Sequence, residues 1–517
     1  MRETAYINGN GGWQMKKELR IMEFLLQHAD NHTVSFHMPG HKGSAIYKRF
    51  GYDEFLEKFM DCDITEIPGA DNLFQAEGII KAVQDKYREL YDVSHSYLLI
   101  NGTSGGIIAS ILAAVPAGGQ LVMARNCHKS VFNALTLGGI RPVYAYPQLI
   151  PEYGISGEIT CKEIEKCLAE NPEASAVILP SPNYYGVCSD IAAIAEVVHR
   201  YGKVLIVDQA HGAHLKFFEE DMPVSAEDAG ADIVINSIHK TLASFTQSAV
   251  LNLNSNRVDR YVLDDKLQAI QSTSPSYLLM ASLDINASIL ELHGSTLMKE
   301  WAENLDYFYS EAAKICAMDD STHSQKPNLE FLTGLKNFDR SKINIDSGGL
   351  SMTAAQLEEA LIKRGIVPEL TTGNILMLMT GIGNTREDYD RLLSALKQII
   401  RERRQQLGSS SPSPSAQKGA SHTDSVLMSR AQVPLSPTPK KTQLFAIPKK
   451  WKRIPLIEAE GKICASSIIP YPPGIPLVCP GEMLDKDTIA YIKALRDAGE
   501  KVIGVNENGE VAVGFDE

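Results

Sequence analysis

The sequence lacks the marks of several large protein classes. No CxxC pair occurs among the eight cysteines, so zinc-ribbon spacing and a thioredoxin-like redox motif are both missing, and we expect no metal site. The first twenty residues contain no apolar core of a secretory signal. The longest nearly apolar run, Ile107 to Ala117, is too short to span a bilayer. These absences predict a cytoplasmic protein that makes no membrane contact.

The sequence is also short of positive charge. The formal net charge is -13 and the sequence pI is about 5.6. Nucleic-acid binding needs clustered Lys and Arg, so we expect no nucleic-acid partner. The 517 residues are 44% hydrophobic and 22% charged, which is enough apolar material for a sizeable core. At roughly 100–200 residues per domain, this length predicts about three domains.

Residues 75–250 alternate between helical and strand-like segments. Residues 78–91 have the pattern of an amphipathic helix. Short apolar strands separated by helices predict an α/β domain with a mostly parallel sheet. The strands are expected at residues 96–100, 120–124, 176–179, 204–207 and 233–236.

Changes in composition predict the domain boundaries. We expect an N-terminal segment at 1–30, a major domain at 31–290 and a smaller α/β domain with longer helices at 291–407. A Ser/Pro-rich tract at 408–432 cannot bury enough apolar surface to fold, so we interpret it as a disordered linker. Residues 433–517 would then form a last domain.

Lys240 directly follows a strand that we expect to be buried. A lysine at a strand end is ordinarily a surface residue, because burying an ammonium is costly. Its neighbours Ser237, His239 and Thr241 favour another interpretation, since hydroxyl and imidazole groups suit a phosphate. A partly desolvated pocket also lowers the pKa of a lysine, as Schiff-base chemistry requires.

Asp208 ends another expected strand and continues as Gln-Ala-His211-Gly. The carboxyl ends of parallel strands are where α/β folds place ligands. An acid here could keep the pyridinium of pyridoxal 5'-phosphate (PLP) protonated. The alternative is a helix N-cap. The 32 residues from Asp208 to Lys240 are about one strand–helix–strand excursion, so both side chains can point into one cleft.

Two further segments follow expected strands. Asn101-Gly-Thr103-Ser104-Gly105-Gly opens a helix, and its glycines, hydroxyls and helix N-terminus suit the phosphate of PLP. Gly-rich turns of this kind are frequent, so the signal is weak alone. His128 could stack on a cofactor ring, although a lone histidine is more often structural.

Taken in order, these segments resemble the bacterial ornithine/lysine/arginine decarboxylase family. Two long motifs carry most of the resemblance: His-Met-Pro-Gly-His-Lys-Gly at 37–43, and Tyr-Pro-Pro-Gly-Ile-Pro with Pro-Gly-Glu at 471–482. Because the first motif begins at residue 37, we expect the short, biosynthetic type of enzyme. The other matching segments are residues 63–69, 102–104, 126–130 and 237–240.

The resemblance implies the aspartate-aminotransferase fold (fold type I) and PLP as cofactor. It implies that Lys240 carries the cofactor, Asp208 pairs with its pyridine nitrogen, His128 stacks on its ring and His211 lies close to it. Asn183-Tyr-Tyr-Gly stands where the family has a cofactor-proximal loop, with Asn in place of Thr. The phosphate would be held by Thr103, Ser104, Ser237 and His239.

The implied reaction is decarboxylation of a basic amino acid to an amine for polyamine synthesis, with arginine favoured over lysine and ornithine. One alternative is a fold type I aminotransferase or aldolase, which would not need the C-terminal motif. Another is a non-catalytic PLP-fold binding protein. The resemblance also implies a homodimer or a higher homo-oligomer. Asp63, Glu66 and Glu482 are the candidate carboxylates for a guanidinium, unless they cap helices or form surface ion pairs.

Overall fold

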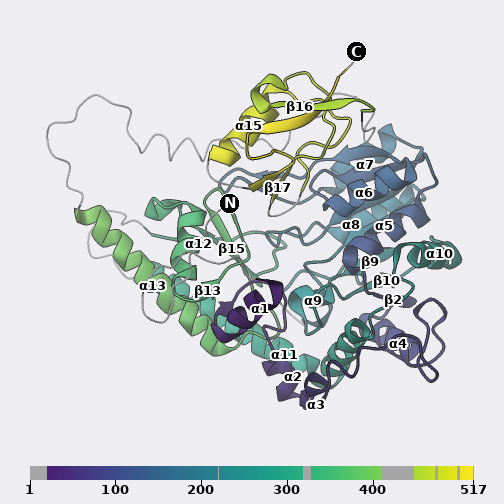
Figure 1. Ribbon diagram of the computed structural model, residues 1–517, viewed down its shortest axis with the longest axis horizontal. Helices are drawn as coiled ribbons and strands as arrows, with labels where there is room; N and C mark the ends of the chain where they lie inside the picture. The colour runs from purple at the N-terminus through teal and green to yellow at the C-terminus, as the bar shows by residue number, and fades with distance from the viewer. Residues whose placement is uncertain are drawn as a thin grey trace.

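The computed structural model describes residues 20–218, 221–317, 328–409, 448–471, 475–497 and 501–515. A seven-stranded sheet with the strand order β2-β10-β9-β8-β7-β3-β4 forms the centre of its largest part (Figure 1). β10 is antiparallel to both of its neighbours, and the other pairs are parallel. The α/β class is thereby confirmed. The strands are β2 (His95–Leu99), β3 (Gln120–Ala124), β4 (Arg141–Ala145), β7 (Ala174–Pro180), β8 (Val204–Asp208), β9 (Ile233–Asn236) and β10 (Ala249–Leu253).

Five of these strands were expected from apolar runs, and two were not. β4 begins with Arg141 and Pro142 at the sheet edge, where no long apolar run is needed. β10 contains the buried Asn252, which breaks the apolar pattern. Its side chain is satisfied by Ser96 Oγ–H at 2.7 Å and by Glu227 Oε1, to which it donates at 2.8 Å. A polar residue can therefore lie in a central strand when neighbouring strands supply its partners.

Helices cover the sheet, so the central strands are buried on both sides, as in α/β folds with parallel strands (Figure 1). α4 confirms the helix expected at residues 78–91. α5 is apolar almost throughout, which fits its position against β8, β9 and β10. These helices are α4 (Ile79–Tyr91), α5 (Gly102–Ala114), α6 (Lys129–Gly138), α7 (Cys161–Glu170), α8 (Ile191–Arg200) and α10 (Arg260–Ile270).

The long helix α11 (Tyr277–Ala317) leads from this sheet to a smaller domain. That domain has a four-stranded antiparallel sheet in the order β11-β12-β15-β14. β1 pairs with β13 in parallel, so the N-terminal part of the chain also packs here. The elements are β1 (Val34–Ser35), β11 (Glu330–Phe331), β12 (Lys342–Asp346), β13 (Ile366–Val367), β14 (Leu370–Thr372), β15 (Ile375–Met379), α12 (Ala354–Ile362) and α13 (Arg386–Ser409).

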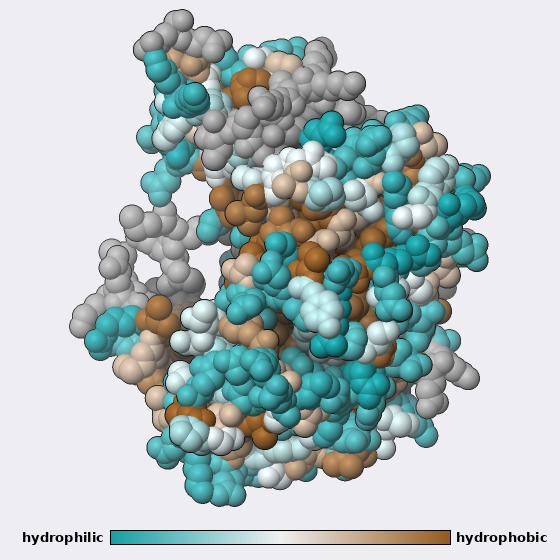
Figure 2. Space-filling view, turned by 90° about the vertical axis from the view of Figure 1, so that its right-hand side faces the viewer, coloured by the Kyte–Doolittle hydropathy of each residue, from teal (hydrophilic) through white to brown (hydrophobic). Residues whose placement is uncertain are grey.

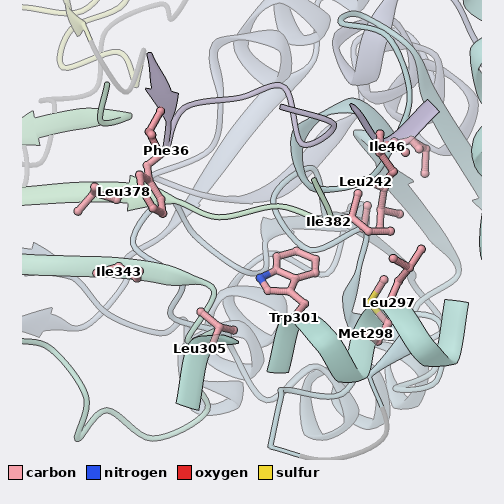
Figure 3. Packing of buried hydrophobic residues seen from close by; sticks show 14 of the residues in the cluster. Phe36, Ile46, Leu242, Leu297, Met298, Trp301, Leu305, Ile343, Leu378 and Ile382 are labelled. Carbon is pink, nitrogen blue, oxygen red and sulfur yellow. The ribbon is translucent and has the colours of Figure 1, made fainter. Parts of the chain in front are cut away.

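One apolar core joins α11, the small domain and the N-terminal segments (Figure 3). Trp301 of α11 lies near its centre, 3% exposed, and donates from Nε1–H to Thr380 Oγ1 at 2.9 Å. The bond satisfies the polar atom of a buried indole. The small domain is therefore held against α11 and the N-terminal segments by the apolar side chains that they bury together. Besides Trp301, the residues of this core that Figure 3 labels are Phe36, Ile46, Leu242, Leu297, Met298, Leu305, Ile343, Leu378 and Ile382.

The C-terminal part has its own small core and two two-stranded sheets. Its elements are β16 (Trp451–Pro455), β17 (Ile469–Tyr471), α15 (Lys486–Asp497), β18 (Lys501–Ile503) and β19 (Glu510–Gly514). The linker expected at 408–432 lies, from residue 410 on, outside the described residues and stays a prediction. In the described ranges, no helix combines the length and apolarity needed to cross a membrane.

The remaining elements are short and connect the larger ones. They are α1 (Ile21–Asp30), α2 (Ala45–Arg49), α3 (Asp53–Glu57), α9 (Ile238–Thr241), β5 (Leu149–Ile150), β6 (Ile155–Ser156) and the 3-10 turns Leu73–Gln75, Leu215–Phe217, Gly348–Leu350 and Leu456–Glu458.

Candidate active site

A cavity of about 310 Å³ lies at the carboxyl ends of the parallel strands. This is the edge where α/β sheets bind ligands. The structure brings eight of the nine expected site residues to its wall. They are Thr103, Ser104, His128, Asp208, His211, Ser237, His239 and Lys240.

Lys240 is in α9, the single helical turn that follows β9. Its Nζ lies 2.9 Å from His211 Nε2. Burial lowers the pKa of Lys240, Asp208 and Glu369 oppose this effect, and Lys342 adds to it. A lysine with a lowered pKa has a larger share of the neutral amine, the nucleophilic form.

Asp208 is the last residue of β8 and is 6% exposed. Its Oδ1 accepts a hydrogen bond from Ala210 N–H at 3.2 Å. The next helical turn begins only at Leu215, so Asp208 is not a helix N-cap. Burial raises the pKa of Asp208, and the nearby Lys240 opposes that rise. Burial therefore favours the neutral acid, and a cationic group in the cavity, such as the Lys240 ammonium, favours the carboxylate.

The start of α5 and the turn after β9 form one corner of the cavity. Thr103 Oγ1 and Ser237 Oγ lie 3.2 Å apart there. Gly102 has a φ of +68°, a conformation that favours glycine. Gly105 does not line the cavity: a Cβ there would lie 3.1 Å from the Asn101 side chain. Its small size serves helix packing.

His239 lies at the same corner, with a pKa that burial lowers to about 4. Its Nδ1–H donates to the Ser248 carbonyl oxygen at 2.9 Å. In the neutral ring Nε2 then carries no proton, so His239 could donate to an anion only after protonation.

His128 both lines the cavity and caps a helix. Its Nδ1 accepts from Ser130 N–H at 3.3 Å at the start of α6, which leaves the proton on Nε2. Burial lowers the pKa of His128 to about 4, with further contributions from Lys240 and Lys129. The ring is therefore neutral near pH 7, so it can lie against an aromatic cofactor at no cost in charge burial.

The loop at 183–187 forms another wall. The ring centroids of Tyr184 and His211 are 4.4 Å apart, and Lys240 Nζ lies 5.7 Å from the centroid of Tyr184. Asn183 Oδ1 accepts from the backbone N–H groups of Tyr185 and Val187 at 3.0 and 3.1 Å. The asparagine at this position therefore shapes the loop.

The cavity wall also contains residues that were not among the expected site residues. Asn126, Gln247 and Ile475 line the cavity, although Ile475 is more than two hundred residues from the others. Asn126 lies two residues before His128, so its amide is within the same segment after β3. Ile475 belongs to the motif at 471–482, and only the docking of the C-terminal part brings it to the cavity.

The three candidate carboxylates for a guanidinium do not line this cavity. Asp63 and Glu66 are exposed on the surface of the single chain. Glu482 is 1% exposed and accepts from Cys479 N–H at 2.7 Å and Tyr144 O–H at 3.1 Å. Its nearest cation is the chain's own Arg125, at 3.9 Å.

Arg125 connects the major domain to the C-terminal part. Its guanidinium donates to the carbonyl oxygens of Pro476 and Leu477 at 2.7 and 2.9 Å, beside Ile475 in the cavity wall. Glu482 and Arg125 are therefore structural residues at this contact within the single chain. Because Glu482 does not line the cavity, it is excluded as the carboxylate that binds the distal group of a substrate there.

Comparison with known proteins agrees with this geometry. A family model described as "Orn/Lys/Arg decarboxylase, major domain" matches residues 21–338, and the model for the C-terminal domain of the same family matches residues 424–510. The fold is that of PLP-dependent fold type I enzymes, and the chain belongs to the Orn/Lys/Arg decarboxylase family.

Individual relatives span almost the whole chain. An arginine decarboxylase of Bacillus subtilis is 32% identical over 94% of this chain and 95% of its own length. A lysine decarboxylase of Pseudomonas aeruginosa is 23% identical over 92% of this chain and 75% of its own. Among solved structures, the constitutive lysine decarboxylase of Escherichia coli superposes with a TM-score of 0.69 at 21% identity, covering 96% of this chain and 81% of its own.

Proposed function

We propose that this protein decarboxylates a basic amino acid, with arginine as the leading substrate, using PLP attached to Lys240. The observation that carries the proposal is the half-buried Lys240, whose side chain shares one cavity with Asp208, His128 and the start of α5. The full-length similarity to arginine decarboxylases supports arginine. The product amine, agmatine from arginine, would feed polyamine synthesis.

The residues present fit PLP. Two buried polar atoms of the cavity wall, Asn126 Oδ1 and His211 Nδ1, have no hydrogen-bond partner among the described residues. Buried polar atoms are almost always paired, so these two favour a polar ligand or bound water. The Thr103 and Ser237 hydroxyls and the N-terminus of α5 suit the phosphate, and Asp208 suits the pyridine nitrogen.

When bound, PLP supplies an electron sink for the pair left on Cα as carbon dioxide departs. Asp208 would hold the proton on the ring nitrogen, and His128 would lie against the ring face. His211 and Lys240, which are 2.9 Å apart, are well placed to return a proton to Cα, and His128 is a further candidate. The alternative of an aminotransferase or aldolase is disfavoured by the match to both decarboxylase domains.

The distal group of the substrate needs a carboxylate that the single chain does not place in the cavity. Asp208 is the only acidic residue among the described residues that line it. We propose that a second copy of the chain supplies the missing carboxylate, from Asp63 or Glu66, in a homodimer. The exposed apolar side chains of Met60 and Ile67, 76% and 51% exposed, support burial of this segment in an interface.

The attachment of the cofactor is tested by chemical trapping. Borohydride reduction of the holoenzyme should fix the cofactor on a single peptide that contains Lys240, as mass spectrometry would show. Lys240→Ala should give no reduced adduct and no turnover, while the exposed Lys336 serves as a control when replaced by Ala. A reduced adduct on another lysine would refute the assignment.

A further inference from the structure

One segment of the small domain, residues 337–344, forms hydrogen bonds with the loop that carries Tyr184. Asp339 N–H donates to the Gly186 carbonyl oxygen at 2.8 Å, and Asn344 Nδ2 donates to the Tyr185 carbonyl oxygen at 2.8 Å. A Cβ on Gly186 would lie 2.8 Å from the Asp339 carbonyl oxygen, so the two backbones touch. The Tyr184 wall of the cavity is therefore held by the small domain.

The same segment holds the loop that carries His211. Lys342 Nζ donates to the His211 carbonyl oxygen at 3.0 Å and to Asp339 Oδ2 at 3.2 Å. His214 Nε2 lies 3.3 Å from Asp339 Oδ1. The side chains of Lys342, Asp339 and His214 are all 0% exposed. The small domain thus places a complete ion pair behind the active-site histidine.

A buried ion pair is weak evidence for stability, because desolvation offsets most of its attraction. A role in the site explains it better. We propose that Lys342 is a positioning residue: by anchoring the His211 carbonyl it aims His211 Nε2 at Lys240 Nζ. The inference rests on the proposed role of Lys240.

The electrostatic environment of Lys240 supports this role. Burial lowers the pKa of Lys240, Asp208 and Glu369 raise it, and Lys342 lowers it. Burial also lowers the pKa of His211, followed by Lys240 and Lys342. Burial alone would raise the pKa of Asp339, but Lys342 and His214 outweigh it and the pKa falls, so Asp339 stays ionised beside Lys342. The titratable groups that act on or near the Lys240 amine are Asp208, Glu369, Lys342, His128, His211 and His239.

The test uses the PLP-loaded enzyme and the pH at which the visible band of the lysine-bound cofactor changes. Lys342→Met removes a cation and should raise the midpoint by about one pH unit, a tenfold change in proton affinity. Asp339→Asn leaves the cation uncompensated and should lower the midpoint. The double variant should return close to the midpoint of the unaltered enzyme.

Measurements of kcat distinguish the positioning of His211 by Lys342 from the effect of the Lys342 charge. Lys342→Met and the double variant should both lose at least tenfold in kcat, with KM within about threefold, because both lack the anchor on the His211 carbonyl. The surface variant Lys336→Met is the control and should change neither quantity. If a single variant fails to fold, as thermal melting would show, the double variant, which leaves no unpaired charge, still provides the turnover test.

The proposal is overturned if the two single variants shift the midpoint in the same direction or not at all, or if the double variant keeps full kcat. A different failure would point to the proposed function: if the unaltered enzyme shows no band of a lysine-bound cofactor, Lys240 does not carry it, whatever Lys342 does.

Discussion

At the residue scale, Asp208 and Lys240 each favour the charged state of the other against the effect of burial. Burial raises the pKa of Asp208 and lowers that of Lys240, and each partner opposes the shift. Asp208 is the last residue of the buried strand β8, and Lys240 lies four residues after the end of the buried strand β9. A cofactor that carries a proton on its ring would use the Asp208 carboxylate, and its linkage to Lys240 would form through the neutral amine.

Replacing Asp208 by Asn tests the acid at the ring nitrogen. The variant should still bind PLP, because the phosphate corner and Lys240 are unchanged, but kcat should fall on the order of 100-fold, as for loss of one preorganised electrostatic contact at a reacting centre. Absorbance would report cofactor content and amine release would report turnover. Near-normal turnover would mean that another acid holds the ring proton.

Most of the candidate site could be predicted at this scale because its residues follow strands whose apolar runs are visible in the sequence. Lys342 and Asp339 could not, because they come from the small domain about a hundred residues after Lys240. The sequence of β12, Lys-Ile-Asn-Ile-Asp, alternates polar and apolar residues as a half-exposed strand does, yet all five residues are buried. The partner of Glu482 was equally hidden, since Arg125 lies more than three hundred residues before it.

At the element scale, the motif at 37–43 links the turn that carries Lys240 to the small domain through backbone hydrogen bonds. Gly40 N–H donates to the His239 carbonyl oxygen at 2.7 Å, and Gly383 N–H donates to the Gly40 carbonyl oxygen at 3.0 Å. Ile382 N–H donates to the Thr241 carbonyl oxygen at 2.9 Å. The motif therefore has a physical role in the fold: it packs the α9 turn against the small domain.

Gly40→Ala should disturb this contact. A Cβ at Gly40 would lie 2.3 Å from the Thr241 carbonyl carbon, where only backbone could yield. We expect a loss of about 1–3 kcal/mol or more in the free energy of unfolding and weaker PLP retention. Gly334→Ala is the matched control, because a Cβ there meets no atom within 4 Å. Equal melting temperatures and equal cofactor retention in the two variants would contradict this role.

At the scale of the whole molecule, the single chain offers apolar surface that it does not cover. α1 has no buried residue and exposes Ile21 and Leu26, 81% and 59% exposed. The side of the molecule that carries α10 also shows apolar residues near the middle of the view (Figure 2). The residue pattern of a single sequence does not predict association between copies. The homodimer is therefore predicted only by the family resemblance.

Ile67→Glu tests the proposed dimer interface. A charge at this exposed apolar position should weaken association and lower activity at dilute protein concentration, because burying an unpaired carboxylate is costly. Sedimentation would measure the oligomeric state. Ile457→Glu, at a position 76% exposed in the C-terminal part, is the control. An unaltered enzyme that is monomeric and active would contradict the dimer.

The central claim is most directly tested by amine release from arginine, lysine and ornithine, compared by kcat/KM with the PLP-loaded enzyme. We expect one carbon dioxide per amine, at least tenfold preference for arginine, about 1.4 kcal/mol in the transition state, and no product from Lys240→Ala. A tenfold preference for lysine or ornithine would refute arginine and leave the decarboxylase standing. Absence of amine from all three amino acids would contradict the account.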